Sequence, residues 1–434
     1  MNKSASEWLP GRAAPVPLLF LVADTGGGHR AAAGAISTEL ARAYPGRFAV
    51  TFCDPLGGPA SRAPLRWVTG LYGPSVRLAP WLWGAAWHAT DSGPAMRLLR
   101  RSLLALADRP VADAVARHRP AAIVSLHPLT GPAAAAARAR LAPAAPLITV
   151  VTDLVTPHAS WSACLDGPVI VPTAAARRRL RVRPGPSEEG GGSGHGEEGV
   201  GRGAIVAGLP VGADFACGPA SPGERAALRH KLGLPAGRFT VVLTGGGEGC
   251  GGLARRARAL LRRSGDVQVV ALCGRNLRLR RRLDRVAARC GGRLTVRGFT
   301  SDMASWLRCA DVVAGKAGPG TIAEATCCGA PLLLTSQLPG QERGNASFVA
   351  AAGAGRYLPG AGRLAAEVAR LRADPAALAA MRGASARLGQ PAAASTVAAL
   401  LAGLAGPPQR PRSGRPDRPA PATAPRPLAG TSHG

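Results

Sequence analysis

The chain has 434 residues, and its 54 Lys and Arg against 25 Asp and Glu give a formal net charge of +29. This length is too great for one ordinary hydrophobic core and favours two domains with linkers. The excess of arginine attracts phosphates, either of nucleic acid or of anionic lipid headgroups, and charge alone does not distinguish these partners.

The N-terminal segment, residues 1–15, lacks the hydrophobic region of a secretory signal, and we expect it to be flexible. Nowhere does the chain contain about 18 uninterrupted apolar residues, so the sequence predicts no transmembrane helix. The nine cysteines include no C-x-x-C pair, which favours reduced, packed thiols over disulfides or a metal site. Together these features predict a cytoplasmic protein.

The first half, residues 16–182, has the pattern of a doubly wound α/β domain. Short, nearly continuous apolar runs alternate with helix-length segments rich in alanine and leucine, as a parallel sheet covered on both faces requires. The predicted strands are Val16–Ala23, Phe48–Cys53, Ala121–Leu126, Leu147–Thr152 and Val169–Val171.

The first strand runs into the sequence TGGGHR. Glycines 26 to 28 allow a tight turn there, and a helix is predicted from about His29. The spacing matches neither a Walker A loop nor G-x-G-x-x-G, so no nicotinamide cofactor is expected. The imidazole of His29 can accept a hydroxyl proton near neutral pH, although a histidine that only caps the helix remains the alternative.

An aromatic stretch, Val68–Leu104, follows in the same half. Because aromatic side chains with arginines alongside are typical of interfacial segments, the stretch predicts contact with the surface of a membrane. A helix of the protein core is the competing interpretation. The predicted membrane-contacting residues are Tyr72, Trp81, Trp83 and Trp87.

The second half repeats the α/β rhythm. A Gly/Glu-rich stretch, residues 183–203, is predicted to be a flexible insertion, and a second domain is predicted over 204–360. Helices are expected over 361–405 and a disordered Pro/Arg-rich tail over 406–434. The strands predicted in this half are Phe239–Thr244, Val267–Leu272, Leu294–Val296, Val312–Ala314 and Pro331–Leu334.

Two loops of the second half are suited to phosphate. Glycines 245 to 247 follow a strand, and Gly318, Gly320 and Thr321 stand where the next helix begins, so backbone N–H groups and the helix dipole can face a diphosphate. We place Glu324 on the first turn of that helix. A carboxylate there suits the two hydroxyls of a ribose, and pairing with the helix dipole is the alternative.

Six segments in order resemble the monogalactosyldiacylglycerol synthases and the processive diacylglycerol glucosyltransferases. They are LFLVADTGGGHRAAAGAI, VTDLVTPHASW, VVLTGGGEG, CGRN, VRGFTSDMASWLRCADVVAGKAGPGTIAEA and LPGQERGN, between Leu18 and Tyr357. More distantly the chain is similar to the N-acetylglucosaminyltransferase of peptidoglycan lipid synthesis. The resemblance implies a GT-B fold, which has two Rossmann-like domains facing a cleft, with the acceptor in the first domain and the UDP-sugar in the second.

For the first domain, the resemblance implies a catalytic pair and an acceptor site. His29, as base or partner of the base, and Asp153 would be catalytic. The residues implied for the diacylglycerol acceptor are Gly27, Gly28, His158 and Trp161.

For the second domain, the resemblance implies a complete donor site. It assigns the diphosphate to the glycine loops, the uracil to Phe299 and Met303, and the ribose to Glu324. Gln341 and Glu342 would bind the sugar hydroxyls. Arg275 would compensate the charge of the leaving UDP, unless it forms a structural salt bridge. The residues implied for the donor are Gly246, Gly247, Arg275, Phe299, Met303, Gly318, Gly320, Thr321, Glu324, Gln341 and Glu342.

The predicted function is transfer of galactose or glucose from a UDP-sugar to diacylglycerol, with inversion and without cofactor or metal, on the inner face of an anionic membrane. The alternatives are an N-acetylglucosamine transferase acting on an isoprenoid-linked or other lipid alcohol, and a non-catalytic basic protein that binds membrane or nucleic acid. The motifs GGGEG and PGQE favour the diacylglycerol branch, and a UDP-sugar 2-epimerase, which has a similar fold, is not favoured. No nucleic acid is expected as a partner, because the arginines form no recognisable recognition helix.

Overall fold

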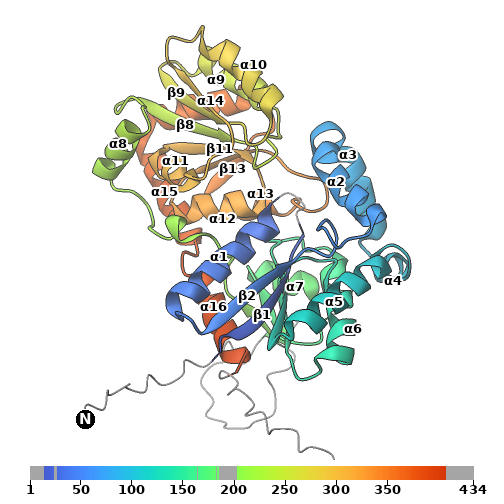
Figure 1. Ribbon diagram of the computed structural model, residues 1–434. Helices are drawn as coiled ribbons and strands as arrows, with labels where there is room; N and C mark the ends of the chain where they lie inside the picture. Colours follow the sequence, from blue (N-terminus) through green and yellow to red (C-terminus); the bar gives the residue numbers. More distant parts are fainter. Residues whose placement is uncertain (1–13, 24–26, 164, 182, 185–202, 407–434) are drawn as a thin grey trace, which may run out of the picture.

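The computed structural model describes residues 14–23, 27–163, 165–181, 183–184 and 203–406. In these residues the strands form two sheets, of seven and six strands, and every pairing is parallel. Figure 1 shows the two sheets one above the other, with helices on both faces of each. The predicted α/β class with two doubly wound units is confirmed.

The first sheet has the strand order β2-β1-β3-β4-β5-β7-β6. Its strands are β1 Val16–Leu21, β2 Phe48–Cys53, β3 Ala122–Ser125, β4 Leu147–Val150, β5 Val169–Val171, β6 Arg183–Pro184 and β7 Gly203–Val206. The helices of this half are α1 Gly28–Ala43, α2 Ala63–Leu78, α3 Pro80–Thr90, α4 Gly93–Arg101, α5 Asp108–His118, α6 Gly131–Leu141 and α7 Ala174–Leu180. Two short 3₁₀ helices, η1 Leu104–Ala107 and η2 Ala159–Ala163, complete it.

The second sheet has the order β10-β9-β8-β11-β12-β13. Its strands are β8 Phe239–Thr244, β9 Val267–Leu272, β10 Leu294–Arg297, β11 Val312–Lys316, β12 Leu332–Ser336 and β13 Gly355–Tyr357. The helices after β7 are η3 Ala213–Phe215, α8 Pro222–Lys231, α9 Leu253–Arg263, α10 Leu277–Ala287, α11 Met303–Cys309, α12 Pro319–Cys327, α13 Asn345–Ala351, α14 Ala361–Ala373, α15 Pro375–Leu388 and α16 Ala393–Leu404.

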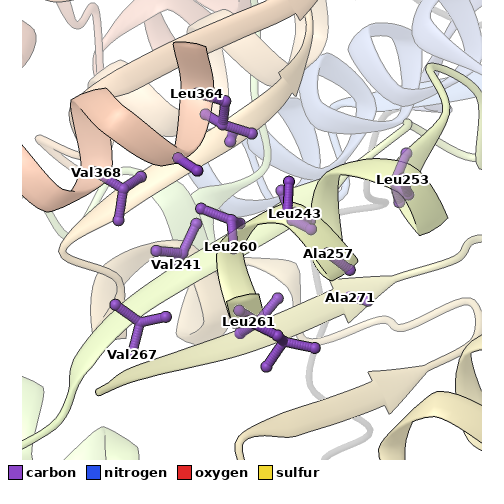
Figure 2. Packing of buried hydrophobic residues seen from close by; sticks show 14 of the residues in the cluster. Val241, Leu243, Leu253, Ala257, Leu260, Leu261, Val267, Ala271, Leu364 and Val368 are labelled. Atoms are coloured by element: carbon purple, nitrogen blue, oxygen red, sulfur yellow. The ribbon is translucent and has the colours of Figure 1, made fainter. Parts of the chain in front are cut away.

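Each sheet has a core on both faces, which is why its strands are apolar along their whole length. On one face of the second sheet, α9 and α14 pack together over strands β8 and β9 (Figure 2). The side chains at this contact are Val241, Leu243, Val267, Leu260, Leu364 and Val368. Full burial of each such side chain contributes about 1.5–3 kcal/mol, so these contacts hold the strand ends that carry the site.

Two parts of the chain cross the predicted domain boundary. Residues from 204 were assigned to the second domain, but β7 pairs with β5 in the first sheet. Arg183 and Pro184, assigned to the flexible insertion, form β6 and pair with β7. The rest of the insertion, residues 185–202, lies outside the described residues, as do 1–13 and 407–434. At the other end of the chain, α16 returns to the first half and packs against α1 and the first sheet.

Candidate active site

A cavity of about 470 Å³ lies between the two sheets. Loops at the carboxyl ends of strands from both sheets form its walls, which is where open parallel sheets bind ligands. From the first half, Gly27, Gly28, His29 and Asp153 line it. All eleven residues predicted for the donor line the same cavity: Gly246, Gly247, Arg275, Phe299, Met303, Gly318, Gly320, Thr321, Glu324, Gln341 and Glu342.

The loop after β8 requires glycine at two successive positions. A Cβ at Gly245 would lie 2.2 Å from the carbonyl oxygen of Cys250, and Gly246 has a φ of 68°, in the left-handed region that favours glycine. The loop can therefore fold back tightly on itself and form the cavity wall with peptide groups rather than side chains.

The N-terminus of α12 opens into the cavity without a side-chain cap. Gly318 occupies the N-cap position with Pro319 as the first helical residue, and Gly320 and Thr321 line the cavity behind it. The first N–H groups of a helix have no partner within the helix and carry its positive partial charge. This end of the cavity is therefore suited to an anion such as a diphosphate.

Glu324 lies on the second turn of α12, because the first turn contains no acidic residue; the predicted first-turn position is corrected. Burial raises the pKa of its carboxyl to about 7. Among the described residues no hydrogen bond to this carboxyl is present, although it lines the cavity. A half-buried carboxylate that lines the cavity, with no donor from the described residues, is suited to the hydroxyls of a ligand.

Phe299 and Arg275 form a pair at the mouth of the cavity. The guanidinium carbon of Arg275 lies 4.7 Å from the centre of the Phe299 ring, and the ring is 63% exposed. No carboxylate of the described residues forms a salt bridge with Arg275, so the alternative structural salt bridge is corrected. The guanidinium remains available to a ligand anion, and the exposed ring to a planar base.

Asp153 connects the two halves of the molecule. Its Oδ2 accepts a hydrogen bond from Nε1 of Trp161 at 2.7 Å, and its Oδ1 accepts one from Nε2 of Gln341 at 3.2 Å. Burial raises the pKa of Asp153 to about 6, and these two donors oppose the rise. Trp161 is 2% exposed and does not line the cavity, so its predicted contact with the acceptor is corrected: it holds Asp153 instead.

His29 is almost fully buried at the start of α1. Its Nδ1 is 2.7 Å from Oγ1 of Thr152, and its ring contacts that of His127, with the centres 4.6 Å apart. Burial lowers the pKa of His29 to about 4, so the ring is neutral at neutral pH. Thr152, the neighbour of Asp153, also lines the cavity. It was not predicted as a site residue, and its position directly before Asp153 is the one sequence feature that could have indicated it.

His158 does not reach the cavity, and its predicted role in binding the acceptor is corrected. Its Nδ1 is 2.8 Å from Oγ of Ser160, and its Nε2 is 3.2 Å from Oγ1 of Thr90 at the end of α3. The ring also packs against that of Trp87. His158 therefore ties the end of α3 to the segment that carries Asp153.

Glu342 lines the cavity, but both of its carboxylate oxygens already have donors from the protein. Oε1 forms an ion pair with Lys316, and Oε2 accepts the N–H of Leu338 at 2.8 Å. Each carboxylate oxygen can accept more than one hydrogen bond, so the contact with sugar hydroxyls stays a prediction beside the ion pair with Lys316. Lys316 lines the cavity at the end of β11. It was not predicted as a site residue, because its partner Glu342 lies 26 positions later in the sequence and the pairing is not visible there.

The predicted membrane-contacting residues divide between two faces of the α2–α3 hairpin. Trp81 is 70% exposed. The rings of Tyr72 and Trp83 meet edge to face, with centres 4.9 Å apart, and pack against side chains of the second half. Trp87 lies against the backbone of Gly340, where a Cβ would come within 2.2 Å of the indole. Tyr72, Trp83 and Trp87 are half-buried, so for these three residues the membrane contact stays a prediction.

The sequence is similar to known glycosyltransferases. Residues 240–397 match the family model described as glycosyltransferase family 28 C-terminal domain. The probable monogalactosyldiacylglycerol synthase 2 of Oryza sativa subsp. japonica is 33% identical over 353 residues, which are 79% of this chain and 71% of that protein. Monogalactosyldiacylglycerol synthase 3 of Arabidopsis thaliana is 30% identical over 78% of this chain and 70% of its own. The chain belongs to the monogalactosyldiacylglycerol synthase family.

Solved structures with a similar fold include MurG of Acinetobacter baumannii, with a TM-score of 0.55, 15% identity and coverage of 90% of this chain and 100% of that one. Another is Anabaena Alr3699/HepE in complex with UDP-glucose, with a TM-score of 0.51, 17% identity and coverage of 89% and 99%. The predicted GT-B fold is confirmed, and so is the prediction that the chain is a glycosyltransferase.

Two further features concern the membrane and metals. No helix in the described part of the chain has the length and hydrophobicity to cross a bilayer. Within the same ranges, no cluster of three or more His, Cys, Asp or Glu side chains is arranged to hold a metal ion.

Proposed function

We propose that the enzyme transfers galactose from UDP-galactose to diacylglycerol. The observation that carries this proposal is that one cavity holds both the donor-type residues of the second half and Asp153 of the first, with Gln341 bonded to Asp153 across the two. The names of the relatives support galactose as the sugar and diacylglycerol as the acceptor.

The proposed reaction is a single displacement. The acceptor hydroxyl oxygen forms a bond to the anomeric carbon while the bond from that carbon to the β-phosphate oxygen breaks. The electron pair of the broken bond leaves with UDP, and the hydroxyl proton passes to a base of the enzyme. Attack from the face opposite UDP inverts the anomeric centre.

Asp153 is the better candidate for this base, with His29 as its partner. A base is most effective when its pKa is close to the working pH. The pKa of Asp153 is raised to about 6 and that of His29 lowered to about 4, so Asp153 is ionised at pH 7 and binds a proton more strongly than His29. The neutral imidazole can still hold the acceptor hydroxyl by a hydrogen bond.

The donor would be held along the second half. The contacts support Phe299 against the uracil, Glu324 on the ribose hydroxyls, and the N-terminus of α12 on the diphosphate. The amide oxygen Oε1 of Gln341 is buried without a partner among the described residues, which supports a contact with a sugar hydroxyl. Gln341 would then contact the sugar with one end of its amide and the base with the other.

The lipid acceptor would enter past α2 from a membrane surface. One side of α2 lines the cavity through Tyr72 and Val76. The opposite side of the hairpin exposes a group of large apolar side chains, which is what an interfacial segment requires. This exposed group consists of Trp67, Leu71, Leu78, Trp81 and Leu82. We therefore propose peripheral binding to an anionic membrane through this face.

The test is direct. Purified enzyme is incubated with vesicles containing diacylglycerol and with UDP-galactose or UDP-glucose, and the glycolipid is identified by mass spectrometry and its anomeric configuration by NMR. The proposal expects a β-linked galactolipid. Release of UDP without any glycolipid, or an α-linked product, would contradict it.

A further inference from the structure

Lysine is rare in this chain. Of the 54 positively charged residues, only Lys3, Lys231 and Lys316 are lysines, and the others are arginines. Of the two lysines in the part of the chain that the structure describes, Lys316 lines the cavity between the two sheets. Almost every positively charged residue of this chain is an arginine, yet this position is a lysine. The reason should lie in the size and shape of the side chain that the site accepts.

The surroundings of Lys316 hold its ammonium group beside the start of α12. The pairing register shifts between Gly315 and Lys316, at the end of β11. Nζ forms an ion pair with the buried carboxylate of Glu342, which Leu338 holds in turn through its N–H. Nζ also lies 3.2 Å from the place of a Cβ on Gly318, the N-cap of α12.

We propose that Lys316 binds the diphosphate of the donor and that Glu342 positions it. An ammonium has three N–H donors, and Glu342 accepts one of them. The others, together with the free N–H groups of α12, can reach one bound diphosphate. As the bond between the sugar and the β-phosphate oxygen breaks, the electron pair goes to that oxygen, and a hydrogen bond from Nζ stabilises it.

The geometry also gives a reason for a lysine at position 316 and a glycine at position 318, which lies beside the ammonium group. A guanidinium is a broad planar group, whereas an ammonium is compact. The buried carboxylate of Glu342 lies on one side of Nζ, and a Cβ on Gly318 would lie 3.2 Å from it, so the compact ammonium beside a glycine is the better fit. The inference rests on the proposed function only in taking a nucleoside diphosphate as the leaving group.

Binding of UDP is compared with binding of uridine, which lacks the phosphates. Lys316→Met is expected to weaken UDP binding about tenfold or more and to leave uridine binding unchanged, because only UDP loses a charge-assisted hydrogen bond. Lys231→Met, at an exposed position on α8, is the matched control and should bind both ligands as the wild type does. Calorimetric titration of both ligands measures the contrast.

Glu342→Gln tests the positioning role. It should reproduce the selective loss of UDP binding, whereas a residue that binds only sugar hydroxyls would weaken UDP-galactose and leave UDP unchanged. If Lys316→Met unfolds the protein because Glu342 loses its counter-ion, the double variant removes both charges and carries the same comparison. Equal losses for UDP and uridine, or no loss for either, would overturn the inference.

These outcomes are separate from the fate of the proposed function. A selective loss of UDP binding in an enzyme that makes no galactolipid would refute the assignment of the acceptor while supporting Lys316 as a diphosphate ligand. Galactolipid synthesis by the wild type, together with unchanged UDP binding in Lys316→Met, would support the proposed function and refute Lys316 as a diphosphate ligand.

Discussion

Replacing Trp161 by phenylalanine should move the acid limb of the pH–rate profile. The indole N–H donates to Asp153 at 2.7 Å, and phenylalanine removes this donor while an aromatic ring remains in the buried site. A hydrogen bond to a charged group contributes about 1.5–3 kcal/mol, and one pKa unit corresponds to about 1.4 kcal/mol. The pKa of Asp153, now about 6, should therefore rise by about 1–2 units.

The rise works against the ionised base. At pH 7 the ionised fraction of Asp153 would fall from about nine-tenths to between about half and one-tenth, and activity would recover at higher pH. The remaining donor, Gln341, still lowers the pKa, and Glu342 raises it, in wild type and variant alike. The assay is kcat/KM for galactolipid formation from pH 5 to pH 9. An activity loss that is the same at every pH would mean that Trp161 has only a packing role.

Three further perturbations test other parts of the site. Glu324→Gln should weaken UDP binding about tenfold at pH 8, as measured by calorimetry. The affinity of the wild type for UDP should rise as the pH increases through about 7, because ribose hydroxyls favour the ionised carboxylate. An affinity of the wild type that does not depend on pH would refute the ribose contact. Trp67→Ser with Trp81→Ser should reduce binding to anionic vesicles in sedimentation while the melting temperature changes little, since both rings are exposed; unfolding would place them in the core. Gly245→Ala should lower UDP affinity at least several-fold, because its Cβ would meet a carbonyl oxygen at 2.2 Å, whereas Gly403→Ala has open space and should bind UDP normally.

The fold was predictable because both sheets are covered on two faces. Buried parallel strands are apolar at every position, and such runs are recognisable without an alignment; Phe48–Cys53 and Phe239–Thr244 have the predicted bounds. The strand β7 was misassigned because it follows a Gly/Glu-rich stretch that separates it in sequence from the sheet it joins. Hydrophobic pattern indicates a strand but not its partner.

The cavity-lining residues of the donor half were predictable because they follow strand ends and glycine loops. The direction in which individual side chains point was less predictable from the sequence. Trp161 and His158 were expected to face the acceptor, yet both point into the protein and hold Asp153 or α3. Trp83 and Trp87, four residues apart, lie on one face of α3, and Trp81 lies nearly opposite. This helical spacing was present in the sequence and could have separated the inward rings from the exposed one.

The most direct test of the account compares wild type with Asp153→Asn in the presence of diacylglycerol vesicles and UDP-galactose. The account predicts galactolipid from the wild type and a fall in kcat of about 10²–10⁴-fold in the variant, the usual contribution of a general base. UDP affinity should stay within about twofold, because among the described residues the hydrogen bond between Asp153 and the donor half is the one with Gln341. Turnover of Asp153→Asn close to that of the wild type would contradict the assignment of the base, and a wild type that forms no galactolipid would contradict the function.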